Sequence, residues 1–187
     1  MTRGGRTQYT VLGVLTLGPR SGYDIKKFIE GSTNYFWQES FGQIYPALKK
    51  LAAAGLVRPC SRDGAGRPGR VVYEITGAGS SELRDWLVER PAPQVRRSEL
   101  LLKLFFGTEM TTETSLQHVE GKREELHEEL KAMRTILEWL DSELDTAAGY
   151  PFWRLAVRQG IVVNEALLEW CNEADHAIRK RGSPKAT

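Results

Sequence analysis

The chain has 187 residues, 41% of them hydrophobic and 27% charged, with a net charge of +2. This composition is too apolar and too weakly charged for a disordered chain, and the length is sufficient to bury one or two cores. No apolar run approaches the roughly 20 residues that span a membrane. The N-terminal segment also lacks the small-residue cleavage site of a signal peptide.

The N-terminal region predicts an apolar element followed by a capped helix. Residues 9–17 (YTVLGVLTL) suit either a buried strand or a short helix, and their pattern alone does not decide between the two. Residues 21–31 predict a helix, because Ser21 is a suitable N-cap and Asp24 stands three positions later to complement it. Gly31 provides the stop signal of this helix.

A second helix is predicted over residues 40–54. Ser40 and Gln43 match a capping box at its start, and Gly55 provides a stop signal. Its apolar residues recur at helical spacing and predict a buried face: Ile44, Ala47, Leu48 and Leu51. The opposite face contains Gln43, Tyr45, Pro46, Lys49, Lys50 and Ala53. Proline inside the helix is expected to distort its first turns.

A β-hairpin and a third helix are predicted next. Residues 56–61 and 70–76 form the two strands, the second rich in β-branched and aromatic residues, and a Gly- and Pro-rich loop joins them. Arg67 in the loop and Arg70 beside it make the tip of the hairpin basic. The third helix is expected over residues 76–88. Its inner side is predicted to carry Leu83, Trp86 and Leu87.

A linker and a change of charge divide the chain. Pro91 and Pro93 cannot continue a helix, so we expect a first domain over residues 1–90, a linker over 91–97 and a second domain over 98–187. The first domain contains 13 Lys and Arg against 8 Asp and Glu, whereas the remainder of the chain contains 13 against 16. A basic domain fused to an acidic one suggests that the first binds a polyanion.

The region after the linker predicts helices only. A short apolar helix is expected over 98–106, a long one over 112–147 and a last one over 152–178, whose apolar residues lie on more than one side. The long helix has a heptad seam of nine positions, eight of them apolar: Leu116, Val119, Arg123, Leu126, Leu130, Met133, Leu137, Leu140 and Leu144. The long helix either folds back so that its seam packs on the last helix of its own chain, or packs its seam against a second chain. A bundle that contains helices from two chains is compatible with both arrangements.

No group of residues predicts catalysis, a metal or a cofactor. Gly64, Gly66 and Gly69 match G-x-G-x-x-G, but a strand follows them, whereas a dinucleotide site requires a helix there. The paired glutamates of the long helix are typical of a solvated coiled-coil surface. Cys60 and Cys171 are too few for a disulfide framework and show no metal-ligand spacing, so a reducing cytoplasm is the expected compartment.

The order helix, helix, hairpin, helix in a basic domain is typical of a winged helix-turn-helix. A DNA major groove admits one helix, whose exposed face supplies base and phosphate contacts. Arg67 and Arg70 would then reach the adjacent backbone or minor groove. The predicted fold class is therefore mainly α: a winged helix-turn-helix domain with a two-stranded hairpin, followed by a helical dimerisation domain with a long coiled-coil-like helix.

The same residues resemble the PadR family of transcriptional regulators. The resemblance rests on Leu12-Gly13, Ser21-Gly22-Tyr23-Asp24-Ile25, Phe36-Trp37, the run SFGQIYPALKKL at 40–51, Gly55-Leu56-Val57 and Tyr73-x-Ile75-Thr76-x-x-Gly79. The region 91–187 resembles, more loosely, the helical C-terminal domain of virulence-gene activators. The resemblance implies that residues 8–17 form the first helix, that the protein is a homodimer, and that it represses transcription. In several members of the family, small and often aromatic molecules relieve the repression.

The resemblance also implies roles for individual residues. By this resemblance, residues 40–54 correspond to the recognition helix and residues 56–75 correspond to the wing. Together with the charge pattern, this places at DNA Tyr23, Ser40, Gln43, Tyr45, Lys49, Lys50, Arg67 and Arg70. Three of these have structural alternatives: Gln43 closes the capping box, Tyr45 packs on the hairpin, and Tyr23 packs on the first helix. Trp37 and Trp153 are least explained by periodicity and are candidates for an aromatic effector site.

The sequence thus predicts a cytoplasmic, dimeric repressor that binds a palindromic operator in double-stranded DNA. A palindrome requires two-fold symmetry in the protein, so residues 112–147 and 152–178 are expected to form the dimer interface. Two alternatives remain open. The first alternative is a transcriptional activator of the same fold, and the second is a winged-helix adaptor that binds proteins instead of DNA.

Overall fold

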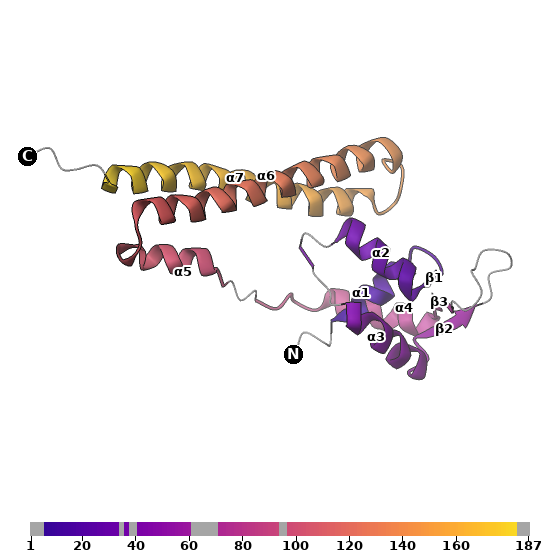
Figure 1. Cartoon of the computed structure of the whole chain (residues 1–187). Coiled ribbons are helices and arrows are strands. Elements are labelled where there is room, and N and C mark those ends of the chain that lie inside the picture. The colour runs from indigo at the N-terminus through magenta and orange to yellow at the C-terminus, as the bar shows by residue number, and fades with distance from the viewer. Residues whose placement is uncertain (1–5, 34–35, 38–40, 61–70, 94–96, 183–187) are drawn as a thin grey trace, which may run out of the picture. The chain divides into compact units, whose positions relative to one another are not determined.

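The chain forms two compact units, Met1–Pro93 and Gln94–Thr187. The computed structural model describes residues 6–33, 36–37, 41–60, 71–93 and 97–182 (Figure 1). The element order confirms the predicted fold class, since the chain is mainly helical and its first unit contains a small winged sheet. Within the described ranges, no helix is both long and apolar enough to cross a membrane.

The first unit begins with helices and one short strand: α1 (Thr7–Leu15), β1 (Arg20–Ser21), α2 (Gly22–Ser32) and α3 (Phe41–Ala53). Because α1 is a helix, most of the first apolar segment, residues 9–17, is helical and does not form a buried strand. The predicted capping box of α2 is present, because Ser21 Oγ accepts a hydrogen bond from the Asp24 N–H and the Asp24 carboxylate accepts one from the Ser21 N–H, both at 3.2 Å. The start of α2 is therefore determined locally.

The predicted hairpin consists of β2 (Val57–Cys60) and β3 (Val72–Ile75), and α4 (Gly77–Val88) follows it. The sheet has three strands instead of two, in the antiparallel order β1-β3-β2, with Val57 opposite Ile75. The sequence does not predict β1, because two residues are too few to show an alternating pattern.

The helices and the wing of the first unit enclose one apolar core. Its largest members are Val11, Leu12, Leu15, Ile25, Ile29, Ile44, Leu48, Leu51, Val57 and Leu83. The prediction that Leu87 faces inward is wrong, since this side chain is 64% exposed. Trp86 instead stacks on Tyr9 of α1, with ring centroids 4.6 Å apart and planes 6° apart. Because this stack fills the contact between the end of α4 and α1, Leu87 stays at the surface.

The second unit consists of α5 (Glu99–Phe105), the short 3-10 helix η2 (Gly107–Glu109), α6 (Thr112–Glu143) and α7 (Tyr150–Gly182). The long helices α6 and α7 run antiparallel as a hairpin (Figure 1). The α6 helix ends before the predicted residue 147, and α7 begins before residue 152. Pro151 does not break α7, because it lies in the first turn, where a missing N–H leaves no intrahelical bond unmade.

The heptad seam of α6 packs against α7 of the same chain. The predicted alternative in which the long helix folds back on the last helix of its own chain is therefore present in a single molecule. The buried apolar residues of α6 are Val119, Leu126, Leu130, Met133 and Leu140, and those of α7 include Val157, Ile161 and Cys171. Arg123, the polar member of the seam, also contacts α7. Its guanidinium donates to Oδ1 of Asn172 and, at 3.5 Å, to the carbonyl oxygen of Cys171.

The apolar residues of the second unit do not all enter this seam. Along α7, Leu155 is 66% exposed, and Phe152, Val162 and Leu167 are also at the surface. The α5 helix exposes Leu101, Leu102 and Phe105, and Phe106, which follows directly after it, is also exposed. The single chain therefore leaves a second apolar surface on α7 and another on α5.

Candidate nucleic-acid interface

The α3 helix is anchored by its inner face and exposes an aromatic and basic outer face. Ile44, Leu48 and Leu51 are buried in the core of the first unit. Tyr45 is 58% exposed and Lys49, one turn later, is also exposed. Lys50 and Pro46 are exposed beside them, and α3 continues through Pro46 without a break. Burial of one side thus fixes the direction in which the other side chains project.

Tyr45 packs on the start of α2. A Cβ atom at Gly22 would lie only 2.7 Å from Cε1 of Tyr45, so the tyrosine ring covers a backbone position at which a side chain would collide with it. The sequence did not predict α2 as a neighbour of Tyr45. This contact joins the outer face of α3 to the first turn of α2 and leaves more than half of the tyrosine exposed.

Gln43 is tied to α1. The hydroxyl of Thr7 donates a hydrogen bond of 3.2 Å to Oε1 of Gln43, and the glutamine is half-buried. This contact was not among the predicted alternatives, because it joins residues far apart in the sequence. It holds the start of α3 against α1, so Gln43 has a structural role whether or not it also reaches a base. Ser40, its predicted partner in the capping box, lies outside the described residues.

Tyr23 lies at the start of α2, next to the position that Tyr45 covers. Its side chain is 36% exposed, and Nζ of Lys27 lies 5.3 Å from the centroid of its ring. This is within the range of a cation–π contact. The sequence reasoning missed Lys27, although its spacing of four residues from Tyr23 on a predicted helix is a usable signal.

The predicted DNA contacts of the wing, Arg67 and Arg70, lie outside the described residues. The glycine fingerprint at 64–69 lies there too. The described part of the wing carries one further arginine, Arg58 on β2, whose Nε lies 2.5 Å from Oε1 of Glu74 on β3. This ion pair joins the two strands at the surface.

The two candidate effector residues are placed in different units. Trp37 is half-buried, and its backbone N–H donates to the carbonyl oxygen of Thr33 at 2.8 Å. Trp153 is half-buried in the first turns of α7, and a Cβ atom at Gly149 would lie 2.3 Å from its ring. Gly149 therefore provides the space that Trp153 occupies in the turn between α6 and α7.

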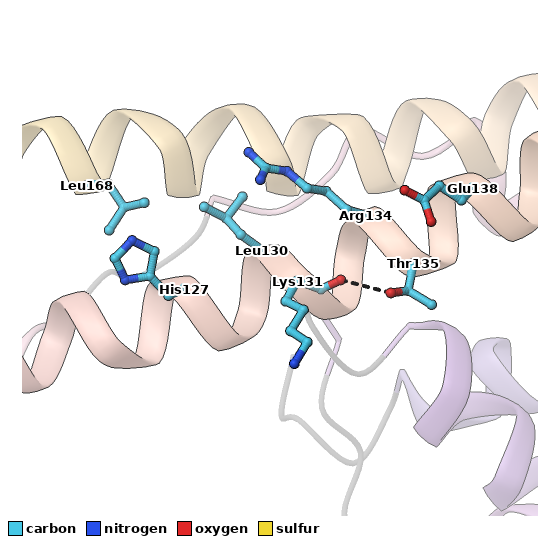
Figure 2. Close-up of a pocket in the computed structure, with 7 residues that line it drawn as sticks. All are labelled: His127, Leu130, Lys131, Arg134, Thr135, Glu138 and Leu168. Carbon is cyan, nitrogen blue, oxygen red and sulfur yellow. Dashed lines mark hydrogen bonds between the residues drawn. The ribbon is translucent and has the colours of Figure 1, made fainter.

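An open pocket of about 410 Å³ lies on the α6–α7 pair (Figure 2). Its lining residues are His127, Leu130, Lys131, Arg134, Thr135, Glu138 and Leu168, of which only Leu168 comes from α7. Arg134 reaches toward α7, where its Nη2 donates to Glu165 at 3.0 Å, and Thr135 donates to the carbonyl oxygen of Lys131 at 3.1 Å. Because one helix face forms most of the lining, the pocket does not enclose a ligand. Neither candidate tryptophan belongs to it.

Burial and hydrogen bonding raise the pKa values of two tyrosines and one cysteine. Burial raises the pKa of Tyr9, and the hydrogen bond from its hydroxyl to Glu82 raises it further. The hydrogen bond to Asp141 raises the pKa of Tyr150, and burial raises the pKa of the Cys171 thiol. In the part of the chain that the structure describes, no three His, Cys, Asp or Glu side chains gather as they would around a metal ion.

Two family models match the chain. The model described as the transcriptional regulator PadR-like family matches residues 11–85, and the model described as virulence activator alpha C-term matches residues 96–179. The negative transcriptional regulator PadR of Bacillus subtilis is 35% identical over 100 residues, which are 53% of this chain and 55% of that protein. That match therefore spans about half the length of the Bacillus protein. A transcriptional regulator of Mycobacterium tuberculosis is 26% identical over 176 residues, covering 86% of this chain and 91% of its own.

Solved structures have the same fold over most of both chains. Bacillus subtilis PadR in complex with operator DNA matches with a TM-score of 0.78 at 23% identity, covering 91% of this chain and 98% of that chain. The same protein in complex with p-coumaric acid matches with a TM-score of 0.76 at 23% identity, covering 96% of this chain and 98% of that chain. The Vibrio cholerae virulence activator AphA matches with a TM-score of 0.73 at 26% identity, covering 94% of this chain and 99% of that chain. Together the two matches show that the chain contains a PadR-like transcriptional-regulator domain over residues 11–85, followed by a domain of the virulence activator alpha C-term type over residues 96–179.

Proposed function

We propose that this chain is a cytoplasmic repressor that binds a palindromic, double-stranded operator as a homodimer. The observation that carries the proposal is the exposed face of α3, where Tyr45, Lys49 and Lys50 project from a helix whose other side is buried. A major groove about 12 Å wide admits such a helix, and its side chains then reach base edges and phosphates. The complex of Bacillus PadR with operator DNA supports this use of the fold.

The second unit is assigned to dimerisation. Exposed apolar surfaces of this kind mark interaction sites, and two copies related by a two-fold axis bury the same residues on both chains. Residues 112–147 and 152–178 form the proposed interface, and α5 adds its exposed leucines and phenylalanines. Such a dimer presents two α3 helices to the two halves of a palindrome.

The contacts to DNA are divided among the helices and the wing. Lys49 and Tyr45 are assigned to the major groove, and Lys50 and Tyr23 to phosphates or groove edges. Ser40 and Gln43 are assigned to the start of the recognition helix, where Gln43 is also held by Thr7. Arg67 and Arg70 add positive charge from the wing.

A small aromatic molecule is proposed as the effector that relieves repression. Bacillus PadR in complex with p-coumaric acid supports this part of the proposal. Trp37 and Trp153 are our candidates for stacking on it. Addition of p-coumaric acid is expected to release the DNA from the wild-type protein but not from Trp37→Ala or Trp153→Ala. Release that survives in both variants would reject these two residues.

Binding to DNA is tested with a duplex that carries the inverted repeat nearest to the gene, with a scrambled duplex as the control. The logarithm of the association constant is expected to fall linearly with the logarithm of salt concentration, by about 0.9 for each phosphate contact. Failure to bind any duplex would support the winged-helix adaptor instead.

Activation is the second candidate function, because the virulence activator AphA has the same two-unit fold. A reporter driven by the regulated promoter distinguishes the two. Deletion of the gene is expected to raise expression if the protein represses, whereas a fall in expression would assign it to activation.

A further inference from the structure

We propose that Lys27 is a further phosphate-binding residue and that the ring of Tyr23 positions it, so that the two act as one unit at the start of α2. The inference rests on the proposed DNA-binding function and adds a residue to it. Three observations carry it: the geometry of the pair, the different surroundings of the neighbouring Lys26, and the contact between α2 and the outer face of α3.

The geometry of the pair directs the charge of Lys27 toward the N-terminal end of α2. Side chains on a helix tilt toward its N-terminus, and Nζ of Lys27 lies 5.3 Å from the centroid of the Tyr23 ring, one turn earlier. The ring thus holds a flexible four-carbon side chain near the first turn of the helix. This reduces the side-chain entropy that the lysine would otherwise lose on binding a phosphate.

Lys26 has different surroundings although it is adjacent in sequence. Its Nζ lies 3.8 Å from Oε1 of Glu30, one turn later, so its charge is partly neutralised and drawn toward the other end of the helix. Among the described residues, Lys27 forms no ion pair with a carboxylate. Lys26 therefore provides a matched control: the same residue type on the same helix with a different orientation.

The first turn of α2 adjoins the proposed recognition surface. Gly22, which precedes Tyr23, is covered by the ring of Tyr45 from α3. The outer face of α3 therefore reaches the first turn of α2, in which Tyr23 lies. The partial positive charge of a helix N-terminus acts in the same direction as the lysine. The nearby carboxylate of Asp24 is engaged by the Ser21 N–H and by the Ser21 hydroxyl at 2.7 Å.

The experiment measures how affinity depends on salt concentration for a duplex that the wild-type protein selects from a random-sequence pool. Lys27→Ala is expected to reduce the slope of log affinity against log salt by about one per protomer, with the base preference unchanged. Lys26→Ala is expected to reduce it by less than half as much. Tyr23→Phe removes the hydroxyl that is assigned to a phosphate, so its affinity is expected to fall, but it keeps the ring and is therefore expected to retain the wild-type slope. Tyr23→Leu is expected to reproduce the loss of slope seen in Lys27→Ala.

Each result decides the inference. A wild-type slope in Lys27→Ala, or equal losses in Lys26→Ala and Lys27→Ala, would overturn the role of Lys27. A wild-type slope in Tyr23→Leu would overturn the positioning role of the ring. If the wild-type protein selects no duplex, the proposed function fails and this inference fails with it, whereas loss of the Lys27 effect alone leaves DNA binding intact.

Discussion

Gly79 shows how closely α4 approaches the wing. The hydroxyl of Thr76 caps α4 by accepting from the Gly79 N–H at 3.1 Å, and it also donates to the carbonyl oxygen of Gly55 at 2.8 Å. The Thr76 N–H donates to the carbonyl oxygen of Leu56 at 3.0 Å. These bonds draw the first turn of α4 against β2, so that a Cβ atom at Gly79 would lie 2.0 Å from that same Leu56 oxygen.

Gly79→Ala is therefore expected to destabilise the first unit by about 1–3 kcal/mol, because the colliding atom belongs to the backbone and cannot move aside. Chemical denaturation measures the change. Gly77→Ala is the control, since a Cβ atom there meets no atom within 4 Å and should leave stability unchanged or slightly raised. Equal stability of the two variants would contradict the close contact.

Lys49 is the residue through which the α3 assignment is tested. Lys49→Ala should weaken operator binding by about 1–3 kcal/mol per half-site if the side chain contacts a base. A mobility-shift titration at moderate salt measures the loss. Lys180→Ala, which removes an exposed lysine in the last turn of α7 beyond the proposed interface, is the control for net charge. Wild-type affinity in Lys49→Ala would reject its assigned role.

The elements differ in how firmly they are held, and this affects what each can contribute to recognition. The α3 helix is anchored by buried leucines and isoleucine, and it has further contacts to α1 through Gln43 and to α2 through Tyr45. A helix fixed from three sides keeps its exposed side chains in register with a groove. We therefore expect base discrimination from α3 and charge from the arginines of the wing.

Replacement of both Arg67 and Arg70 by Ala tests this division. If the two side chains contact phosphates, the slope of log affinity against log salt should become shallower by about 2 units, while the preferred base sequence stays the same. The measurement is a salt titration of operator binding combined with selection from a random pool. A changed sequence preference at an unaltered slope would show that the wing reads bases.

The second unit has one apolar stripe that is buried within the single chain and another that only the proposed dimer would bury. The buried stripe of α7 faces α6, and polar pairs accompany it: Asn164 donates to Glu129 at 2.7 Å, and Arg134 donates to Glu165 at 3.0 Å. The other apolar stripe, which includes Leu155, is exposed in the single chain. These two stripes allow the intramolecular and intermolecular contacts to be tested separately.

Leu155→Glu is expected to give a folded monomer with lower operator affinity. The side chain is 66% exposed in the single chain, so a carboxylate there costs little in the fold, but it would be desolvated without a partner in a dimer. Loss of the dimer separates the two half-sites and removes the gain from linking them. Leu87→Glu, the same change at a leucine that is 64% exposed on α4 of the first unit, is the control. Sedimentation decides the matter: a wild-type protein that is monomeric at micromolar concentration yet binds its operator fully would contradict this interface.

The sequence by itself determined the features that depend on residues close together along the chain. Ser21 and Asp24 specify the start of α2, and the 3-4 spacing of leucines specifies α6, because capping and periodicity act over one or two helical turns. The motif at 40–51 likewise indicated a PadR-like domain, which the family model over residues 11–85 confirms. Even the polar exception in the seam, Arg123, was identifiable as such before its partner was.

Only the tertiary structure decided which distant residues meet. The two-residue strand β1 exists because β3 offers it a partner, and Trp86 instead of Leu87 faces α1 because Tyr9 stacks on it. Tyr45 rests on Gly22, and Thr7 holds Gln43, across separations that no local pattern records. The division of α7 into a stripe that packs on α6 and a stripe that stays exposed has the same cause. Both stripes are apolar in the sequence, and burial of one depends on the geometry with which the two helices cross.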